Sequence, residues 1–149
     1  MGRKRICIVS SPGGHLTEVL ALKPCYGRYD YFYVLNDEAL LSQEMQGRTF
    51  FIRHSERDLL FFVNLWEAWK ILRRERPALL LSTGAGAIVP FTLVGKLLGI
   101  RSIFVETFTR VTKPSLTGRI MYRLADRFFY QCKSVGRYFP RAVCGGPLV

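Results

Sequence analysis

Residues 6–24, ICIVSSPGGHLTEVLALKP, run from an apolar segment through two adjacent glycines and a histidine into a second apolar-rich segment. Four consecutive apolar residues followed by a turn are typical of a buried strand, and LTEVLALKP favours a helix that stops near Pro24. We therefore predict a strand over residues 5–10 and a helix over residues 16–24. The turn between them is either a plain connection or a place where a bound ligand leaves no room for side chains.

The same alternation continues along the rest of the chain. Short apolar segments predict strands over residues 29–35, 49–53, 78–83, 101–107 and 127–131, and the segments between them predict helices over residues 55–76, 87–98 and 115–125. Strands that alternate with helices are typical of parallel βαβ units. We predict one α/β domain over residues 1–149, built on a Rossmann-like, doubly wound parallel sheet.

The chain is strongly basic, and its positive charge is concentrated near the C-terminus. It has 149 residues, of which 49% are hydrophobic, so its composition suits a packed core and argues against disorder. The net charge is +11, and residues 107–149 contain one acid, Asp126, and eight basic residues: Arg110, Lys113, Arg119, Arg123, Arg127, Lys133, Arg137 and Arg141. Such a field favours nucleic acid, an anionic membrane surface or phosphorylated ligands, and charge alone does not choose among them.

Two segments imitate membrane-directing signals. The apolar run ICIV is far shorter than the about 7–15 residues of an export signal. Glycines, Pro90 and Lys96 interrupt the apolar region over residues 79–105, which therefore reads better as strand, turn, helix and strand. We expect a cytosolic chain without a membrane span, and its four cysteines, which form no C-x-x-C pair, are expected to be reduced.

The predicted helix over residues 55–76 has an apolar surface wider than one sheet contact requires. Ser55 and Asp58 suit its first turn. Its polar stripe consists of Asn64, Glu67, Lys70 and Arg74, and its apolar surface includes Leu59, Phe62, Val63, Trp66 and Trp69. The apolar surplus is either all core or a second contact with a membrane or a partner.

Three segments are expected to meet at the ligand-binding edge of the sheet, outside the carboxyl ends of the strands. They are residues 10–15, 82–86 and 106–110, and they supply Ser11, Gly13, Gly14, His15, Thr83, Gly84, Gly86, Glu106, Thr107 and Arg110. Glycines let backbone amides approach an oxygen-rich ligand, and a helix N-terminus favours negative charge. His15 can act as a base or donate to a phosphate, and Glu106 can accept a sugar hydroxyl or its proton.

Each of these features also has a purely structural reading. Gly13 and Gly14 can form only a turn, since they are not part of a G-x-G-x-x-G fingerprint. Gly84 and Gly86 can serve close packing of helix on strand, and Glu106 can pair with a neighbouring arginine. Their expected convergence on one edge favours a binding site over these separate explanations.

Three stretches of the chain resemble the acceptor-side subunits of split glycosyltransferases. They are SSPGGHL, LLLSTGAGAIVPF and FVETFTRVTKPSLTGRIMYRLADRFFYQ, and the resemblance extends from Ile6 to the terminal GGPLV. The family includes bacterial PssD-type polysaccharide proteins and the membrane-recruiting subunit of the eukaryotic dolichol-linked chitobiose transferase. The Gly-Gly-His turn is also similar to that in the N-terminal half of the lipid II-forming N-acetylglucosaminyltransferase.

The resemblance implies the N-terminal, acceptor-binding half of a GT-B fold. A separate donor-binding glycosyltransferase subunit would hold the UDP-sugar, and the acceptor would be a lipid-diphosphate-linked sugar in polysaccharide or exopolysaccharide biosynthesis. The glycine turn would then lie near the acceptor diphosphate, with His15 and Glu106 lining the acceptor side. Arg119, Arg123, Trp66 and Trp69 are candidates for contact with an anionic membrane at the cytoplasmic face of the plasma membrane. Because this chain begins with MGRKR, we expect that contact to be peripheral.

Two other classes of function are open to the same sequence. A free-standing Rossmann-type small-molecule enzyme would explain the glycine turn, and a basic nucleic-acid-binding domain would explain the charge. No recognisable motif of aromatic residues interleaved with basic ones supports the second, so we expect no nucleic-acid partner. The sequence has no Asp-x-Asp motif or histidine cluster, so we expect neither a metal nor a resident cofactor.

Overall fold

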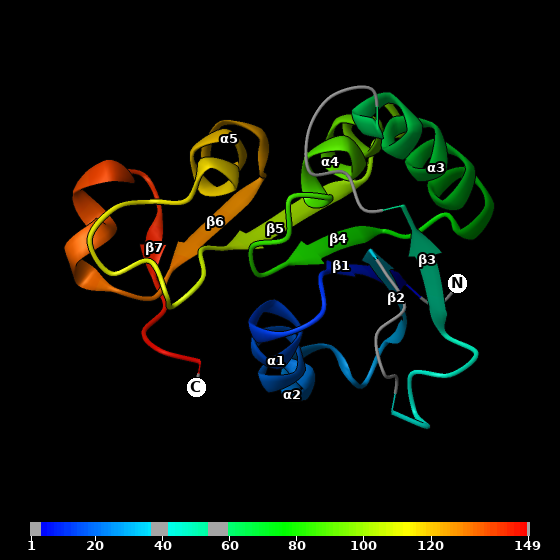
Figure 1. Ribbon diagram of the computed structural model, residues 1–149, viewed down its shortest axis with the longest axis horizontal. Helices are drawn as coiled ribbons and strands as arrows, with labels where there is room; N and C mark the ends of the chain where they lie inside the picture. Colours follow the sequence, from blue (N-terminus) through cyan, green and yellow to red (C-terminus); the bar gives the residue numbers. More distant parts are fainter. Residues whose placement is uncertain (1–3, 37–41, 54–59, 149) are drawn as a thin grey trace.

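The computed structural model describes residues 4–36, 42–53 and 60–148 as a layered α/β structure (Figure 1). Its strands pair in parallel throughout, in the order β3-β2-β1-β4-β5-β6-β7. The strands are β1 (Arg5–Ser10), β2 (Asp30–Asn36), β3 (Thr49–Ile52), β4 (Leu79–Ser82), β5 (Arg101–Val105), β6 (Arg127–Tyr130) and β7 (Val143–Cys144). This is the doubly wound order, and its topological switch point lies between β1 and β4.

Helices cover the two faces of the sheet unequally (Figure 1). One face carries α3 (Leu60–Glu75), α4 (Ile88–Leu97) and α5 (Leu116–Leu124), and the other carries α1 (Gly14–Ala21) and α2 (Lys23–Tyr26). A short 3-10 helix, η1 (Lys133–Tyr138), joins β6 to β7. Because α1 and α4 follow the neighbouring strands β1 and β4 and leave toward opposite faces, their N-termini lie on either side of the switch point.

Two apolar clusters fill the spaces between sheet and helices. The larger, beneath α3, α4 and α5, includes Cys7, Val9, Phe32, Val34, Leu80, Phe91, Phe104, Met121 and Phe128. The smaller, beneath α1 and α2, includes Ile6, Ile8, Val19, Tyr26, Tyr31, Tyr33 and Leu35. Alternate residues of β1 and β2 enter opposite clusters, because successive side chains of a strand point to opposite faces.

An open, apolar groove runs along the less covered face of the sheet. It lies between the α1–α2 segment and the C-terminal residues 145–148, has a volume of about 390 Å³ and is floored by strands β4, β5 and β6. Its lining residues include Leu22, Tyr26, Leu79, Leu81, Ile103, Val105, Phe129 and Leu148. This groove marks the part of the sheet face that α1 and α2 leave accessible.

The predicted elements agree with the observed ones within a few residues, and two details differ. The predicted helix over residues 16–24 begins earlier, at Gly14, and Pro24 lies within α2 instead of ending α1. η1 and β7 were not predicted. Ser55, Asp58 and Leu59, assigned to the start of the long helix, lie outside the described residues.

The predicted polar stripe on α3 is wrong at Asn64. This side chain is 1% exposed and shares the core-facing side of the helix with Ala68 and Leu72. The three residues recur at a spacing of four, so they fall on one face of the helix. The exposed side of α3 instead carries Phe62 and Trp66, which are 68% and 62% exposed.

Candidate functional site

The turn between β1 and α1 has open space in front of it. Gly13 adopts a φ of +94°, a conformation that L side chains rarely adopt, and it precedes α1 without a side-chain cap. A Cβ atom built at Gly13 or Gly14 would meet no atom of the described chain within 4 Å. The first amides of α1 therefore face a space in which an anionic ligand can approach the backbone closely.

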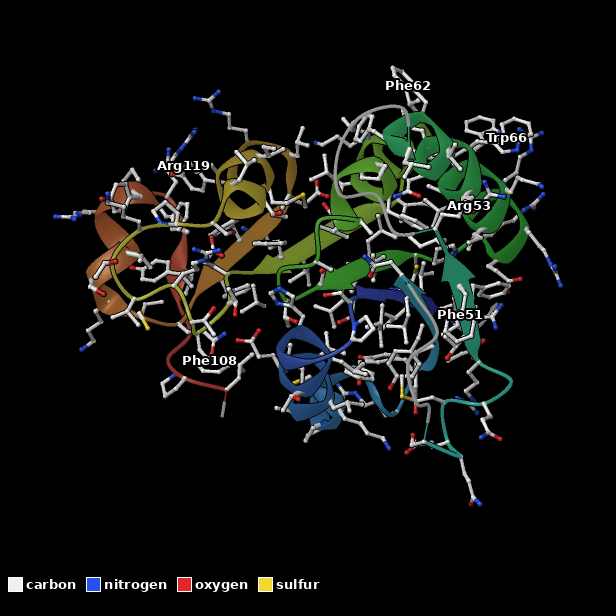
Figure 2. All side chains as sticks on the ribbon, in the orientation of Figure 1. Phe51, Arg53, Phe62, Trp66, Phe108 and Arg119 are labelled. Atoms are coloured by element: carbon white, nitrogen blue, oxygen red, sulfur yellow. The ribbon has the colours of Figure 1, made fainter. Side chains whose placement is uncertain are left out.

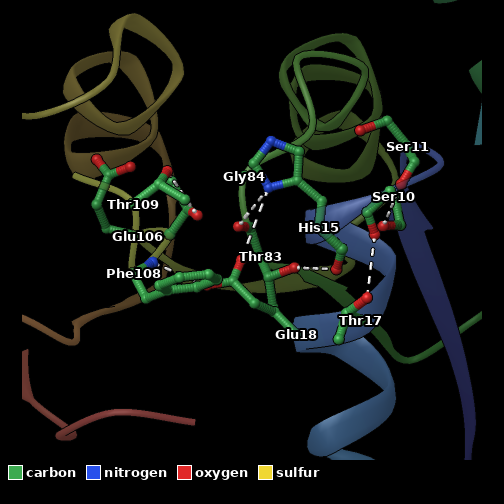
Figure 3. Close-up of polar contacts among 12 residues, drawn as sticks. Ser10, Ser11, His15, Thr17, Glu18, Thr83, Gly84, Glu106, Phe108 and Thr109 are labelled. Carbon is green, nitrogen blue, oxygen red and sulfur yellow. Dashed lines mark hydrogen bonds and ion pairs between the residues drawn. The ribbon is translucent and has the colours of Figure 1, made fainter. Parts of the chain in front are cut away.

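His15 is held in this turn by the loop that follows β4 (Figure 3). Its Nδ1 lies 3.2 Å from the carbonyl oxygen of Thr83, and the Thr83 hydroxyl donates to the carbonyl of His15 at 2.8 Å. The ring also packs on Gly84, where a Cβ atom would lie 2.5 Å from its Cε1. Since a carbonyl can only accept, Nδ1 carries a hydrogen in this arrangement, and Nε2 occupies the opposite edge of a side chain that is 31% exposed.

Glu18 is a buried carboxylate one turn beyond His15, and the sequence analysis did not single it out. It is 0% exposed, and its Oε1 accepts from the Phe108 amide at 2.8 Å and from Nε2 of Gln131 at 2.9 Å. Burial alone would raise its pKa, but His15, Phe108, Gln131 and Thr107 surround it and hold the pKa below its ordinary value. The position of Glu18 as the only acid in the apolar segment LTEVLAL could have indicated that its side chain is buried.

Glu106, predicted on the acceptor side, is fully buried against the first turn of α5. Its Oε1 accepts from the Ser115 hydroxyl at 2.7 Å, and Ser115 also caps α5 by accepting from the Gly118 amide at 2.8 Å. A Cβ atom at Gly118 would lie 1.6 Å from Oε2 of Glu106, so only glycine fits there. Burial outweighs the hydrogen bonds from Ser115 and the amide of Thr107 and raises the pKa of Glu106.

The structure therefore gives the two predicted catalytic candidates different surroundings. His15 has an open edge, whereas both carboxylate oxygens of Glu106 are enclosed between β5 and α5. Glu106 fixes the position of α5. Gln131 connects Glu106 to Glu18, because its side-chain amide donates to the Glu106 backbone carbonyl at 3.1 Å as well as to the Glu18 carboxylate. Ser115, Gly118 and Gln131 are parts of this arrangement that the sequence analysis missed.

The other predicted site residues lie in the same three loops. Ser11 is half-buried, Gly86 and Arg110 are exposed, and the buried Thr107 hydroxyl lies 3.3 Å from that of Thr109. A hydrogen bond from Thr83 joins the loop after β4 to the turn after β1, and Glu18 joins α1 to the loop after β5 (Figure 3). The three segments thus meet at one edge of the sheet.

The predicted membrane-contact residues divide into exposed and packed ones (Figure 2). Trp66, Arg119 and Arg123 are exposed, and Figure 2 shows Phe62, Trp66 and Arg119 on the face of the sheet that carries α3, α4 and α5. Trp69 is partly buried and packs against the larger core cluster. All eight basic residues of the C-terminal third are exposed.

Over residues 4–36, 42–53 and 60–148, no group of three or more histidine, cysteine, aspartate or glutamate side chains is placed to hold a metal ion. Within the same ranges, no helix combines the length and the apolar character needed to cross a bilayer.

Comparison with solved structures identifies the architecture. MurG of Acinetobacter baumannii superposes with a TM-score of 0.71 at 14% identity, over 87% of this chain and 41% of that one. A UDP-N-acetylglucosamine 2-epimerase from Rickettsia bellii superposes with a TM-score of 0.76 at 11% identity, over 99% and 46%. At such identities the likeness concerns the fold alone, and it confirms a Rossmann-like unit of GT-B type. This chain spans less than half the length of either structure.

Comparison with known sequences identifies the family. The mouse UDP-N-acetylglucosamine transferase subunit ALG14 is 28% identical over 180 residues, which cover 97% of this chain and 83% of that protein. Its counterpart in Candida albicans is 34% identical over 82 residues, covering 51% and 37%. A family model described as "Oligosaccharide biosynthesis protein Alg14 like" matches residues 55–148, more than half of the chain. The chain therefore belongs to the Alg14-like family of oligosaccharide biosynthesis proteins.

Proposed function

We propose that this chain, as a single domain, is the acceptor-binding subunit of a heteromeric glycosyltransferase. A donor-binding partner would carry the UDP-sugar, and a lipid-diphosphate-linked sugar on the way to a polysaccharide or exopolysaccharide would be the acceptor. The observation that carries the proposal is the open turn at Gly13–Gly14 with His15 beside it, at the ligand edge of a half-length GT-B fold. Membership of a family whose relatives are named as transferase subunits supports the need for a partner.

The proposed reaction joins the acceptor hydroxyl to the sugar of the donor. The hydroxyl oxygen attacks the anomeric carbon, the bond between that carbon and the UDP oxygen breaks, and UDP leaves with the bonding electrons. Nε2 of His15 accepts the hydroxyl proton, since Nδ1 is already committed to Thr83. The amides at the start of α1 and the exposed Arg110 would bind the diphosphate of the acceptor lipid.

The apolar groove along β4, β5 and β6 supports a partner chain. A doubly wound sheet is normally covered by helices on both faces, whereas here Ile103, Val105 and Phe129 line an open groove. We propose that an amphipathic helix of the donor-binding subunit covers this groove. The cleft between the two chains would then form the transferase site.

The outer helical layer supports peripheral membrane binding. Phe62 and Trp66 on α3 are exposed, and the same layer carries Arg119 and Arg123 on α5. Aromatic side chains enter the interfacial region of a bilayer, and each nearby Lys or Arg adds about 1 kcal/mol of attraction to anionic lipid. We propose that this layer contacts the cytoplasmic face of the plasma membrane, where a lipid-linked acceptor is presented.

The test is reconstitution with the donor-binding subunit. The purified chain, the partner and the mixture are each incubated with labelled UDP-N-acetylglucosamine and a polyprenyl-diphosphate-linked sugar, and transfer of label to lipid is measured. Transfer by the mixture alone is expected. Robust transfer by the isolated chain would indicate a free-standing enzyme, and loss of partner binding on changing Val105 to Asp would support the groove as the docking surface.

A variant of His15 tests the site itself. His15→Ala is expected to leave unfolding and partner binding unchanged and to reduce transfer by about 10²–10⁴-fold, the usual contribution of a general base. Leu20→Ala, at an exposed position in the last turn of α1, is the matched control and should retain full transfer. Wild-type kinetics for His15→Ala would refute the proposed role.

A further inference from the structure

Glu18 presents one satisfied oxygen and one free oxygen, and the free oxygen lies next to His15. Oε1 accepts hydrogen bonds from Phe108 and Gln131, whereas the buried Oε2 has no hydrogen-bonding partner among the described residues. Oε2 lies 3.7 Å from Nδ1 of His15. A fully buried carboxylate oxygen without a donor is costly, so its position beside an imidazole calls for an explanation beyond packing.

We propose that Glu18 is the positioning residue of His15: its carboxylate fixes the hydrogen on Nδ1, so that Nε2 faces the acceptor as an unprotonated nitrogen. This inference rests on the proposed function, in which Nε2 of His15 accepts the acceptor proton. Two acceptors, the Thr83 carbonyl at 3.2 Å and Oε2 of Glu18, surround Nδ1, and neither can donate to it. Together they exclude the tautomer that would place the hydrogen on Nε2.

The carboxylate cannot turn to present its other oxygen, because its neighbours fix its orientation. The amide of Gln131 is fixed in turn, since its Oε1 accepts from the Leu148 amide at 2.9 Å and its Nε2 therefore points toward Glu18. The Phe108 amide holds the same oxygen of Glu18 from the loop after β5. Glu18 thus aligns three segments, α1, the β5–α5 loop and the C-terminal segment, around one ring nitrogen.

This arrangement makes Glu18→Gln a sharp test. The side-chain carbonyl of the new glutamine must take the Oε1 position, because Phe108 and Gln131 both donate there. Its amide group then occupies the Oε2 position and directs an N–H toward Nδ1 of His15. That contact competes with the Thr83 carbonyl for Nδ1 and raises the population of the tautomer with the hydrogen on Nε2, in which Nε2 cannot accept a proton from the acceptor.

The tautomer is measured directly by ¹⁵N NMR of the imidazole nitrogens. The chain contains two histidines, so a His54→Gln variant assigns the signals of His15. At a pH where the ring is neutral, the wild-type chain is expected to carry the hydrogen on Nδ1, and Glu18→Gln is expected to raise the fraction of rings that carry it on Nε2. This measurement needs neither partner nor substrate, so it separates failure of this inference from failure of the proposed function.

Transfer by the reconstituted complex supplies the second readout. Glu18→Gln should lower kcat in proportion to the loss of the tautomer with the hydrogen on Nδ1, by up to about 10⁴-fold where that loss is complete. The double variant His15→Ala/Glu18→Gln should transfer no more slowly than His15→Ala alone, because Glu18 acts through the ring. Gln131→Met is the matched control: it removes one donor from Oε1, but the Phe108 amide still holds that oxygen and keeps Oε2 facing His15, so the tautomer should not change. A hydrogen on Nε2 in the wild type, or an unchanged tautomer and kcat in Glu18→Gln, would overturn the proposal.

Discussion

Replacing Gly84 with alanine tests the geometry that holds the His15 ring. Gly84 has a φ of +136°, and a Cβ atom there would lie 2.5 Å from Cε1 and 2.7 Å from Nδ1 of His15. Alanine must therefore adopt an unfavourable backbone conformation and also displace the ring. Displacement of the ring breaks the contact between Nδ1 and the Thr83 carbonyl.

The size of the effect follows from these two contributions. A residue other than glycine held in a sparsely populated backbone region costs about 1–3 kcal/mol. Loss of a hydrogen bond adds about 0.5–1.5 kcal/mol. We therefore expect Gly84→Ala to lower the free energy of unfolding by about 1.5–4.5 kcal/mol.

The assay is equilibrium unfolding in urea, with Gly86→Ala from the same loop as the control. A Cβ atom at Gly86 would lie 3.9 Å from its nearest neighbour, Thr117 Oγ1, which is an ordinary contact. Gly86→Ala should be neutral or stabilise by up to about 1 kcal/mol, because alanine restricts the unfolded chain. In the double variant His15→Ala/Gly84→Ala only the backbone contribution should remain. Equal urea midpoints for Gly84→Ala and Gly86→Ala would show that the loop does not hold the ring in this way.

Three further changes test other parts of the structure. Because the pKa of Glu106 is raised, the folded chain binds its proton more tightly than the unfolded chain does. The stability of the wild type should therefore fall relative to that of Glu106→Gln as the pH rises above the ordinary glutamate pKa. A stability difference in urea unfolding that does not depend on pH would contradict the burial of this side chain. Exchange of the exposed Phe62 and Trp66 for serine should weaken sedimentation with anionic vesicles without changing unfolding, and undiminished sedimentation would place the membrane contact elsewhere. Leu72→Ala, at a site on α3 that is 1% exposed, should lower the free energy of unfolding by about 2–5 kcal/mol in thermal or urea melts, and a neutral result would argue against the packing of α3 on the sheet.

The sequence predicted the sheet well because its strands are buried on both faces. Such strands appear as short, continuous apolar runs, such as ICIV in β1 and LLL in β4, and they stand out against the helices between them. The order of the strands, in which β1 lies beside β4, is known from the structure. η1 and β7 escaped prediction because they are short and lack a periodic pattern.

The candidate site was predicted in outline but not in its connections. Glycine and polar residues after successive strands indicated which loops would meet, and His15, Thr83 and Gly84 do meet. The roles of Glu18 and Gln131 depend on hydrogen bonds across 90 or more residues, and no local pattern encodes such contacts. The burial of Glu106 likewise depends on Gly118, whose need for glycine arises only when α5 packs against the end of β5.

The long reach of the Glu18 contacts has a consequence for the order in which the chain folds. Residues 5–21 form β1 and α1, but the groups that hold the Glu18 carboxylate lie 90 and 113 positions beyond Glu18. Closing loops of this length is slow relative to forming a helix or a turn. In a nascent chain, the Glu18 carboxylate therefore stays hydrated and mobile until β6 joins the sheet. The turn that carries His15 reaches its final structure only in the last stage of folding.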